Sequence, residues 1–162
     1  MIEKGKISQE PFIEILKTLE EAESAKLVDW NAMNIASVDQ MNRPSSRMVL
    51  LKKISDDGLV FYTNYNSRKG KEIELNPKVA VNFWWRELKK QIRVEGFIEK
   101  ASEEDSDDYF NSRPLKSRVS AIISNQSSTI SSYEDLTNQI DNYLKQNDES
   151  SIKRPDHCGL YI

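Results

Sequence analysis

The sequence is poor in the residues that most often build a reactive centre by themselves. Its 162 residues include one cysteine, one histidine and five glycines. A single cysteine excludes an internal disulfide and suits a reducing cytoplasm. Without a Cys/His cluster no zinc site is expected, and we predict no metal site of any kind. Without a glycine-rich phosphate loop, P-loop and Rossmann nucleotide sites are excluded as well.

Long hydrophobic runs are also missing. The first twelve residues, MIEKGKISQEPF, carry charges with no apolar run behind them, so no signal peptide is expected. No stretch approaches the roughly 20 apolar residues that span a bilayer. The 38% of apolar and 30% of charged residues are typical of a soluble globular chain of one domain. We therefore expect a single cytoplasmic domain that has no membrane partner.

Charge is distributed unevenly along the chain, although the net charge is only −3. Residues 44–100 hold 12 Lys/Arg against 7 Asp/Glu, whereas residues 101–162 hold 6 against 11. A cationic middle in an acidic protein favours a small anionic ligand over a nucleic acid. A solvated surface with uneven charge explains the composition equally well, so the choice depends on motifs.

Hydrophobic periodicity predicts a mainly β protein with flanking helices. Helical spacing predicts helices over residues 10–26, 68–75, 105–111, 114–123 and 133–146. Period-two alternation predicts strands over residues 34–38, 46–54, 59–63, 78–85 and 91–99, with another strand starting near residue 157. Gly58 is expected to take a positive φ in a hairpin turn, and Gly96 to mark a bulge or a close backbone approach. Short antiparallel steps of this kind favour a small β-barrel.

Two cations, Arg68 and Lys69, begin the predicted helix at residues 68–75, directly after Asn66 or Ser67 as a capping residue. Cations at this end oppose the helix dipole by about 0.3–1 kcal/mol each. An anion would reverse the sign, because backbone N–H groups and both side chains could hold a phosphate. The alternative is a pair of solvated surface cations.

Two further clusters combine cations with polar groups. Arg47 and Lys52 flank four apolar residues, and five residues apart they lie on opposite faces of a regular strand, so one could meet a cofactor and the other a substrate. A core strand with charged ends is the alternative. Helical spacing places Tyr109 near Arg113 and Arg113 near Ser117, which could hold a second phosphate. A helix edge with a stacked Tyr–Arg pair is the alternative there.

Taken in order, six segments resemble the pyridoxamine 5'-phosphate oxidase family. They are RMVLLK at residues 47–52, FYTN at 61–64, SRK at 67–69, QIRV at 91–94, YFNSRP at 109–114 and QSS at 126–128. The resemblance implies an FMN-binding split β-barrel in a single domain, residues 1–162. Within it we expect an N-terminal helical segment at residues 1–30, the family core at 31–128, and a C-terminal helix and short end at 132–162.

The resemblance also implies a homodimer with FMN in a cleft between the subunits. By motif position the flavin contacts are Arg47, Met48, Val49, Leu50, Leu51, Lys52, Tyr62, Thr63, Arg68, Lys69, Gln91, Gln126 and Ser127. The phosphate of a vitamin B6 compound is implied to bind Lys52, Tyr109, Arg113 and Ser117. In this family, pyridoxine or pyridoxamine 5'-phosphate becomes pyridoxal 5'-phosphate (PLP), and dioxygen reoxidises the flavin. No residue of the sequence is assigned a catalytic role.

The last six residues, HCGLYI, depart from the family pattern. Family members continue past a Trp-Gly-Gly-like segment into closing strands that carry a tryptophan beside FMN and an Arg-x-His pair over the substrate ring. Here Cys158 stands where a tryptophan is expected, and His157 precedes the motif. The departure keeps open a non-catalytic FMN- or PLP-binding protein. A third interpretation, a flavin reductase or an oxidase of another metabolite such as a phenazine, is disfavoured by the Tyr109, Arg113 and Ser117 set.

Overall fold

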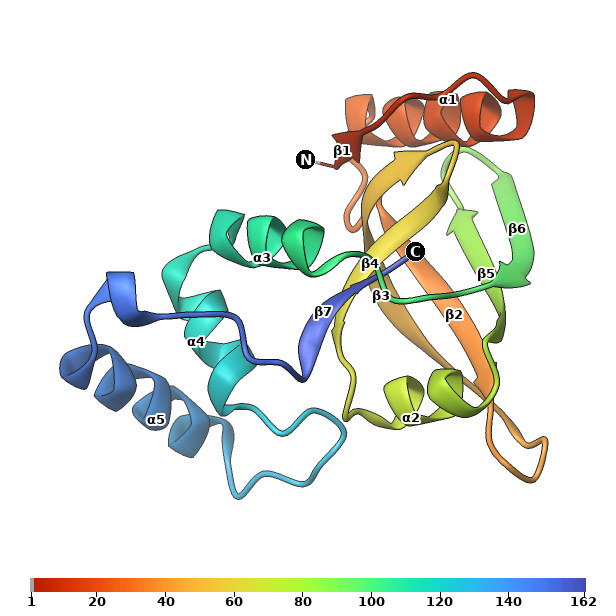
Figure 1. Cartoon of the computed structure of the whole chain (residues 1–162). Coiled ribbons are helices and arrows are strands. Elements are labelled where there is room, and N and C mark those ends of the chain that lie inside the picture. Colours follow the sequence, from red (N-terminus) through yellow and green to blue (C-terminus); the bar gives the residue numbers. More distant parts are fainter. Residues whose placement is uncertain (1) are drawn as a thin grey trace. The chain divides into compact units, whose positions relative to one another are not determined.

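The computed structural model describes residues 2–162, and the chain divides into two compact units (Figure 1). The sheet unit comprises the chain up to residue 62 together with residues 72–99 and 161–162. The helical unit comprises residues 63–71 and 100–160. This division does not test the prediction that the chain forms a single domain, which stays a prediction.

Antiparallel strands dominate the described residues. Their bounds are β1 (Glu3–Lys4), β2 (Ala32–Val38), β3 (Pro44–Ser55), β4 (Gly58–Asn64), β5 (Lys78–Trp85), β6 (Lys90–Phe97) and β7 (Cys158–Tyr161). The strand order is β6-β5-β2-β3-β4-β7, and β1 pairs in parallel with β3 outside this path. The pairs β2–β3, β2–β5, β3–β4 and β5–β6 are antiparallel. The predicted strands and the mainly β architecture are therefore confirmed.

The alternation in β5 shows why these residues form strands. Val81, Phe83 and Trp85 are buried on one face, whereas Trp84 between them is 58% exposed. The rings of Phe83 and Trp85 stack with centroids 5.3 Å apart. The Trp85 indole donates a hydrogen bond of 2.7 Å to the Trp30 carbonyl, which satisfies its polar atom. A period of two thus supplies the apolar interior of the sheet unit.

Two details of the sheet differ from the sequence-based expectations. The register of β3 and β4 shifts between Leu51 and Lys53. The argument that Arg47 and Lys52 lie on opposite faces assumed a regular strand, so this bulge removes its basis. The register of β5 and β6 runs without a shift, and a Cβ at Gly96 would meet nothing within 4 Å. The expectation of a bulge or a close backbone approach at Gly96 is therefore wrong, because the space beside it is open.

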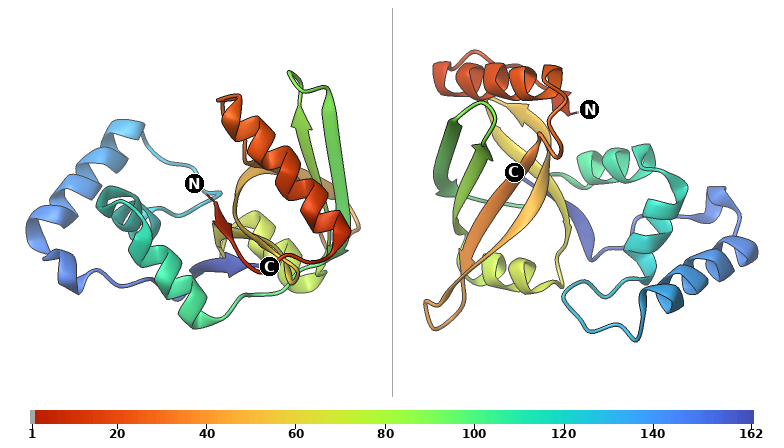
Figure 2. Two further views of the ribbon diagram at one scale, coloured as in Figure 1. Left: turned by 90° about the horizontal axis from the view of Figure 1, so that it is seen from above. Right: turned by 180° about the vertical axis from the view of Figure 1, so that it is seen from behind.

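The turn between β3 and β4 agrees with expectation, since Gly58 has a φ of 152°, a value that favours glycine. The helices also agree within a few residues at their ends (Figure 2). They are α1 (Glu10–Ser24), α2 (Arg68–Leu75), α3 (Glu103–Ser112), α4 (Leu115–Ile123) and α5 (Tyr133–Gln146), with a short 3₁₀ turn, η1 (Glu149–Ser151). Within residues 2–162, no helix combines the length and the apolar character needed to cross a membrane.

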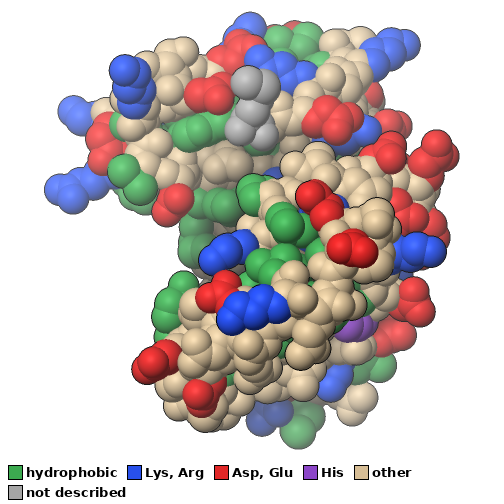
Figure 3. All heavy atoms as spheres, turned by 90° about the vertical axis from the view of Figure 1, so that its left-hand side faces the viewer, with side chains coloured by type: hydrophobic (Ala, Val, Ile, Leu, Met, Phe, Trp, Pro, Cys, Tyr) green, Lys and Arg blue, Asp and Glu red, His purple; other side chains and the backbone are tan. Residues whose placement is uncertain are grey.

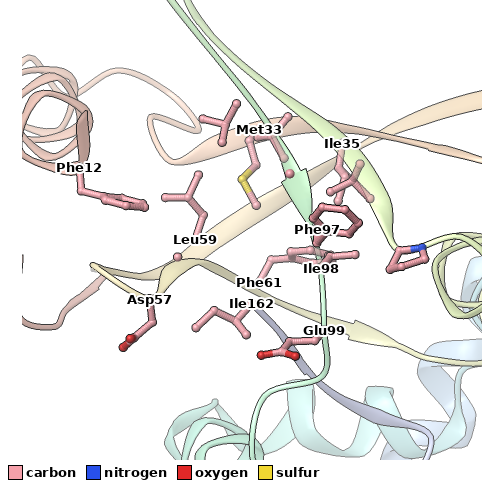
Figure 4. A pocket seen from close by; sticks show the side chains of 16 residues that line it. Phe12, Met33, Ile35, Asp57, Leu59, Phe61, Phe97, Ile98, Glu99 and Ile162 are labelled. Carbon is pink, nitrogen blue, oxygen red and sulfur yellow. The ribbon is translucent and has the colours of Figure 1, made fainter. Parts of the chain in front are cut away.

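The sheet unit contains a cavity of about 730 Å³ (Figure 4). Apolar side chains line most of it, among them Phe12 of α1, Met33 of β2 and Phe61 of β4. The carboxylates of Asp57 and Glu99 lie along one side. Of the described residues that line this cavity, none belongs to the predicted flavin or substrate sets. This cavity therefore has no described lining residue in common with the candidate site.

Candidate functional site

The start of α2 carries a polar cluster within the helical unit, in which Thr63, Ser67 and Lys69 are buried and Arg68 is exposed. Ser67 caps the helix, because its hydroxyl accepts a hydrogen bond of 3.3 Å from the Gly70 amide. Lys69 is only 7% exposed, and its ammonium donates to Thr63 Oγ1 and to Gln126 Oε1, both at 2.7 Å. Lys69 is thus no solvated surface cation, which removes one of the two sequence-based interpretations for this residue.

The loop between α4 and α5 completes this cluster. Gln126 Oε1 also accepts a hydrogen bond from Thr63 Oγ1 at 3.1 Å, so the amide oxygen serves two donors. The Arg68 amide donates to Ser127 Oγ at 3.3 Å, and Ser127 has a positive φ of 68°. Five of the residues predicted to contact flavin therefore lie together in one unit. We name Thr63, Arg68, Lys69, Gln126 and Ser127 the α2 cluster.

Arg47 lies in a second polar cluster, within the sheet unit. Its Nη1 donates to Ser37 Oγ at 2.6 Å, and its Nη2 donates to Ser45 Oγ at 2.5 Å and to Glu72 Oε2 at 3.0 Å. Both serine hydroxyls donate to the same Glu72 oxygen, at 2.6 and 2.7 Å. Sequence reasoning missed Ser37, Ser45 and Glu72, since no local pattern marks side chains 27 and 35 residues from their partner.

The remaining residues predicted from the RMVLLK segment point in different directions. Met48 and Leu50 are exposed, whereas Leu51 is completely buried. The backbone of Leu51 is also engaged, because its amide donates to the Asn31 carbonyl at 2.9 Å and its carbonyl accepts from Asn31 Nδ2 at 2.8 Å. Val49, Lys52 and Tyr62 are half-buried, and exposed Gln91 donates to Asn82 Oδ1 at 2.8 Å. The six consecutive residues of this segment thus differ in the exposure of their side chains.

The third predicted cluster spans the end of α3 and the start of α4. Tyr109, Arg113 and Ser117 are all half-buried. Arg113 ends α3 with an extended backbone (φ −78°, ψ 150°), and Pro114 caps α4. The helical spacing of Arg113 and Ser117 assumed a continuous helix, so that part of the argument is wrong. The three residues belong to the helical unit, whereas Lys52 of the predicted substrate set belongs to the sheet unit.

Arg154 connects α3 with the segment before β7 inside the helical unit. Its side chain is 5% exposed, and it forms ion pairs with Glu103 and, at 2.7 Å, with Asp107. Its Nη1 donates to the Cys158 carbonyl at 2.5 Å. Burial lowers the pKa of Arg154, but hydrogen bonds to Asp107 and Glu103 outweigh that effect and raise it overall. Arg154 thus anchors α3, the helix that carries Tyr109, and the sequence analysis did not identify it.

The other chemistry-bearing residues of this region have structural surroundings. Cys158 is buried, with Sγ 3.6 Å from the Ala121 carbonyl. The His157 carbonyl accepts a hydrogen bond of 2.6 Å from the Tyr65 amide.

On the face drawn in Figure 3, acidic and basic side chains are interspersed. No group of three or more His, Cys, Asp or Glu side chains suited to a metal ion occurs in the described part of the chain.

Comparison with known proteins identifies the family. Residues 19–142 match the family model described as pyridoxamine 5'-phosphate oxidase. The chain belongs to the pyridoxamine 5'-phosphate oxidase family. A pyridoxine/pyridoxamine 5'-phosphate oxidase of Nostoc sp. is 46% identical over 153 residues, which are 94% of this chain and 72% of that relative. A second relative, pyridoxine/pyridoxamine 5'-phosphate oxidase 2 of Hydrogenovibrio crunogenus, is 40% identical over 99% of this chain and 76% of its own length.

Two solved structures share the fold of this chain. PhzG from Burkholderia lata, in complex with tetrahydrophenazine-1-carboxylic acid, has a TM-score of 0.86 and 25% identity over 95% of this chain and 75% of its own. A pyridoxamine 5'-phosphate oxidase-related, FMN-binding protein from Nostoc punctiforme has a TM-score of 0.73 and 18% identity, covering 96% of this chain and 81% of its own. The predicted fold, the split barrel of FMN-binding proteins, is therefore confirmed.

Proposed function

We propose that this member of the pyridoxamine 5'-phosphate oxidase family binds FMN and oxidises pyridoxine and pyridoxamine 5'-phosphates to PLP, with dioxygen as the acceptor. Family membership supports a flavin oxidoreductase. The observation that carries the proposal is the buried ammonium of Lys69 at the start of α2, surrounded by the Thr63 hydroxyl and the Gln126 amide. This arrangement suits the terminal phosphate of FMN.

The α2 cluster fits a phosphate by its donor set. An ammonium, a guanidinium, hydroxyl groups and an amide can exchange their present bonds for bonds to phosphate oxygens. The first backbone N–H groups of α2 lie at the positive end of the helix dipole. A phosphate there turns the unfavourable effect of Arg68 and Lys69 on the dipole into a favourable one. A bound phosphate therefore explains why two cations, Arg68 and Lys69, lie at the positive end of the helix dipole.

The proposed contacts are those that the family resemblance implies. In the helical unit they are the α2 cluster for FMN and Tyr109, Arg113 and Ser117 for the vitamer phosphate. In the sheet unit they are Arg47 to Lys52, Tyr62 and Gln91 for FMN, with Lys52 also serving the vitamer phosphate. FMN, when bound, would supply the two-electron redox chemistry between the vitamer and dioxygen. The protein residues bind and orient both phosphorylated molecules.

The balance of the proposed reaction sets what an assay must detect. Pyridoxine 5'-phosphate and dioxygen give PLP and hydrogen peroxide. Pyridoxamine 5'-phosphate consumes one water in addition and releases ammonia. We further propose a cytoplasmic homodimer without a nucleic-acid partner. Exposed apolar residues of the sheet unit, among them Met48, Leu75 and Phe97, support an interface between copies.

FMN binding tests the proposal through a matched pair of variants on one helix. Lys69 is buried in the α2 cluster, whereas Lys71 is exposed. Lys69→Met should weaken FMN binding by roughly 10- to 100-fold, because a hydrogen bond to a charged group contributes about 1.5–3 kcal/mol. Lys71→Met should bind FMN like the unmodified chain. Quenching of FMN fluorescence measures both, and no quenching by the unmodified chain refutes the proposal.

Turnover is a separate test, because binding and oxidation can be lost independently. The chain saturated with FMN is incubated with pyridoxine 5'-phosphate in air, and PLP is measured against a heat-killed control. We expect PLP and an equal amount of hydrogen peroxide. Flavin binding without PLP would favour the second candidate, a non-catalytic FMN- or PLP-binding protein. Buried Cys158, at a position where the family resemblance places a tryptophan, is the observation that favours this candidate.

A third candidate, an oxidase of a phenazine-type metabolite, is motivated by the structural likeness to PhzG. Arg113 bears on this choice, since the leading proposal assigns its guanidinium to the phosphate of the B6 vitamer. Arg113→Ala should raise KM for pyridoxine 5'-phosphate about tenfold or more, the effect of losing one charge-assisted bond. Exposed Lys116 provides the control, and Lys116→Ala should leave KM unchanged. An unchanged KM in both variants would favour the phenazine-type substrate.

A further inference from the structure

One oxygen atom of Glu72 receives three hydrogen bonds. Glu72 is 4% exposed, and its Oε2 accepts from Ser37, Ser45 and Arg47 at 2.6, 2.7 and 3.0 Å. A buried carboxylate is costly unless charged and hydrogen-bonding partners compensate it. The two hydroxyls and the guanidinium supply that compensation, so all four side chains form one connected network within the sheet unit.

The protons of this network have a defined direction. Each serine has a single hydroxyl proton, which it donates to Glu72, and each accepts from one end nitrogen of Arg47, at 2.6 and 2.5 Å. Rotating the guanidinium would break several of these bonds together. None of them uses the Nε–H of Arg47, and the Arg47 side chain keeps 22% exposure. One edge of the guanidinium is thus held, while part of the side chain faces solvent.

We infer that Glu72 is a positioning residue that orients Arg47 for contact with the flavin nucleotide. The inference rests on the proposed FMN binding, in which Arg47 is one of the contacts. Lys69 and Glu72 lie three residues apart on α2, so one helix carries both the proposed phosphate cation and the carboxylate that holds Arg47. Glu72 itself touches neither cofactor nor substrate in this proposal.

The sign of the effect separates positioning from plain electrostatics. Glu72 is negative, so by charge alone its removal should strengthen the binding of an anionic nucleotide. If its role is to orient Arg47, removal should weaken binding despite the lost repulsion. Glutamine provides the conservative variant, because its Oε1 can accept the same hydrogen bonds without the charge.

The experiment compares Glu72→Ala with Glu72→Gln by titration into FMN. Glu72→Ala should weaken binding by roughly tenfold, the lower end of what losing an orienting partner costs at other sites. Glu72→Gln should bind as tightly as the unmodified chain or more tightly. In an Arg47→Ala background, Glu72→Ala should cause no further loss, since the two residues act as one unit. Tighter FMN binding by both Glu72 variants would overturn the inference. So would a loss of FMN affinity on Glu72→Ala in the Arg47→Ala background that is as large as the loss in the unmodified chain.

A second measurement needs no flavin. The NMR signal of the Arg47 Nε–H group should be sharp in the unmodified chain and in Glu72→Gln, and broadened by exchange in Glu72→Ala. Equal sharpness in all three proteins would overturn the inference. The two failures are distinguishable: an unmodified chain that does not bind FMN refutes the flavin proposal, whereas normal FMN binding by Glu72→Ala refutes only the role of Glu72.

Discussion

In the sheet unit, alternating strands bury Ile35, Phe61 and Phe83 almost completely, whereas the helical unit combines buried apolar residues with ion pairs of poorly exposed arginines. Arg118 pairs with Glu149 there, and Arg154 holds α3 through two carboxylates. Apolar burial depends on a pattern within each strand, but ion pairs depend on partners 31 to 51 residues away. We therefore expect the sheet unit to be destabilised most by substitutions that create cavities. The helical unit should be destabilised by substitutions that remove a charge partner or overpack a tight contact.

The largest effect is expected from a cavity in the sheet unit. Phe83 is completely buried, so Phe83→Ala should lower the free energy of unfolding by about 3–5 kcal/mol. Trp84 follows it in the same strand but is 58% exposed, and Trp84→Ala should cost about 1 kcal/mol or less. Urea denaturation measures both values. Equal losses would show that the alternation in β5 does not define the interior.

A glycine in the helical unit should tolerate no side chain. A Cβ at Gly159 would lie 2.1 Å from the Tyr65 hydroxyl and 3.0 Å from Ser106 Oγ. Gly159→Ala should destabilise the chain by about 1–3 kcal/mol through overpacking. Gly96 of the sheet unit is the matched control, because a Cβ there meets nothing within 4 Å. Thermal unfolding should show a lowered Tm for Gly159→Ala alone, and an equal drop for Gly96→Ala would contradict the comparison.

Ion pairs in the helical unit should contribute to stability according to how deeply they are buried. Arg154→Met should lower the free energy of unfolding by about 1–2 kcal/mol, since the arginine is buried but its carboxylate partners are largely exposed. Lys116 pairs with Asp141 at 3.2 Å with both side chains exposed, so Lys116→Met should change it by less than about 0.5 kcal/mol. Urea denaturation of both variants tests this order, and equal losses would contradict it.

The smallest effect is a pH dependence in the sheet unit. Hydrogen bonds from the Ser8 hydroxyl and from the Ser8 and Gln9 amides lower the pKa of Asp56 below its usual 3.8. Because the folded pKa is depressed, the stabilisation is present above the usual pKa and is lost as pH falls through the lowered one. Asp56→Asn should therefore make the urea midpoint less dependent on pH below about 4. An unchanged acid dependence would contradict this role.

Local patterns account for much of the fold. The bounds of α2 agree with prediction because Ser67 caps it and Pro77 follows its end, and the alternation of β5 predicts its buried face. The bulge in β3 and the open space at Gly96 depend on neighbouring strands, which no single segment encodes. The helical backbone breaks at Arg113 because Pro114 follows it. The sequence already predicted separate helices on the two sides of this break.

The candidate site was predictable in part. Motif order marks Lys69 and Gln126, 57 residues apart, as members of one site, and they meet at 2.7 Å. The burial of Lys69 was not predictable, because a capped helix with cations looks the same whether its first turn is exposed or covered. The network around Glu72 was missed for a similar reason, since a glutamate on a short helix usually faces solvent.

The most direct test is the visible spectrum of the chain reconstituted with FMN, recorded without oxygen before and after pyridoxine 5'-phosphate is added. We predict bleaching of the flavin absorption, appearance of PLP in equal amount, and return of the flavin absorption when air is admitted. A flavin spectrum that the vitamer leaves unchanged would contradict the proposed oxidation, and a chain that retains no flavin after gel filtration would contradict the site itself.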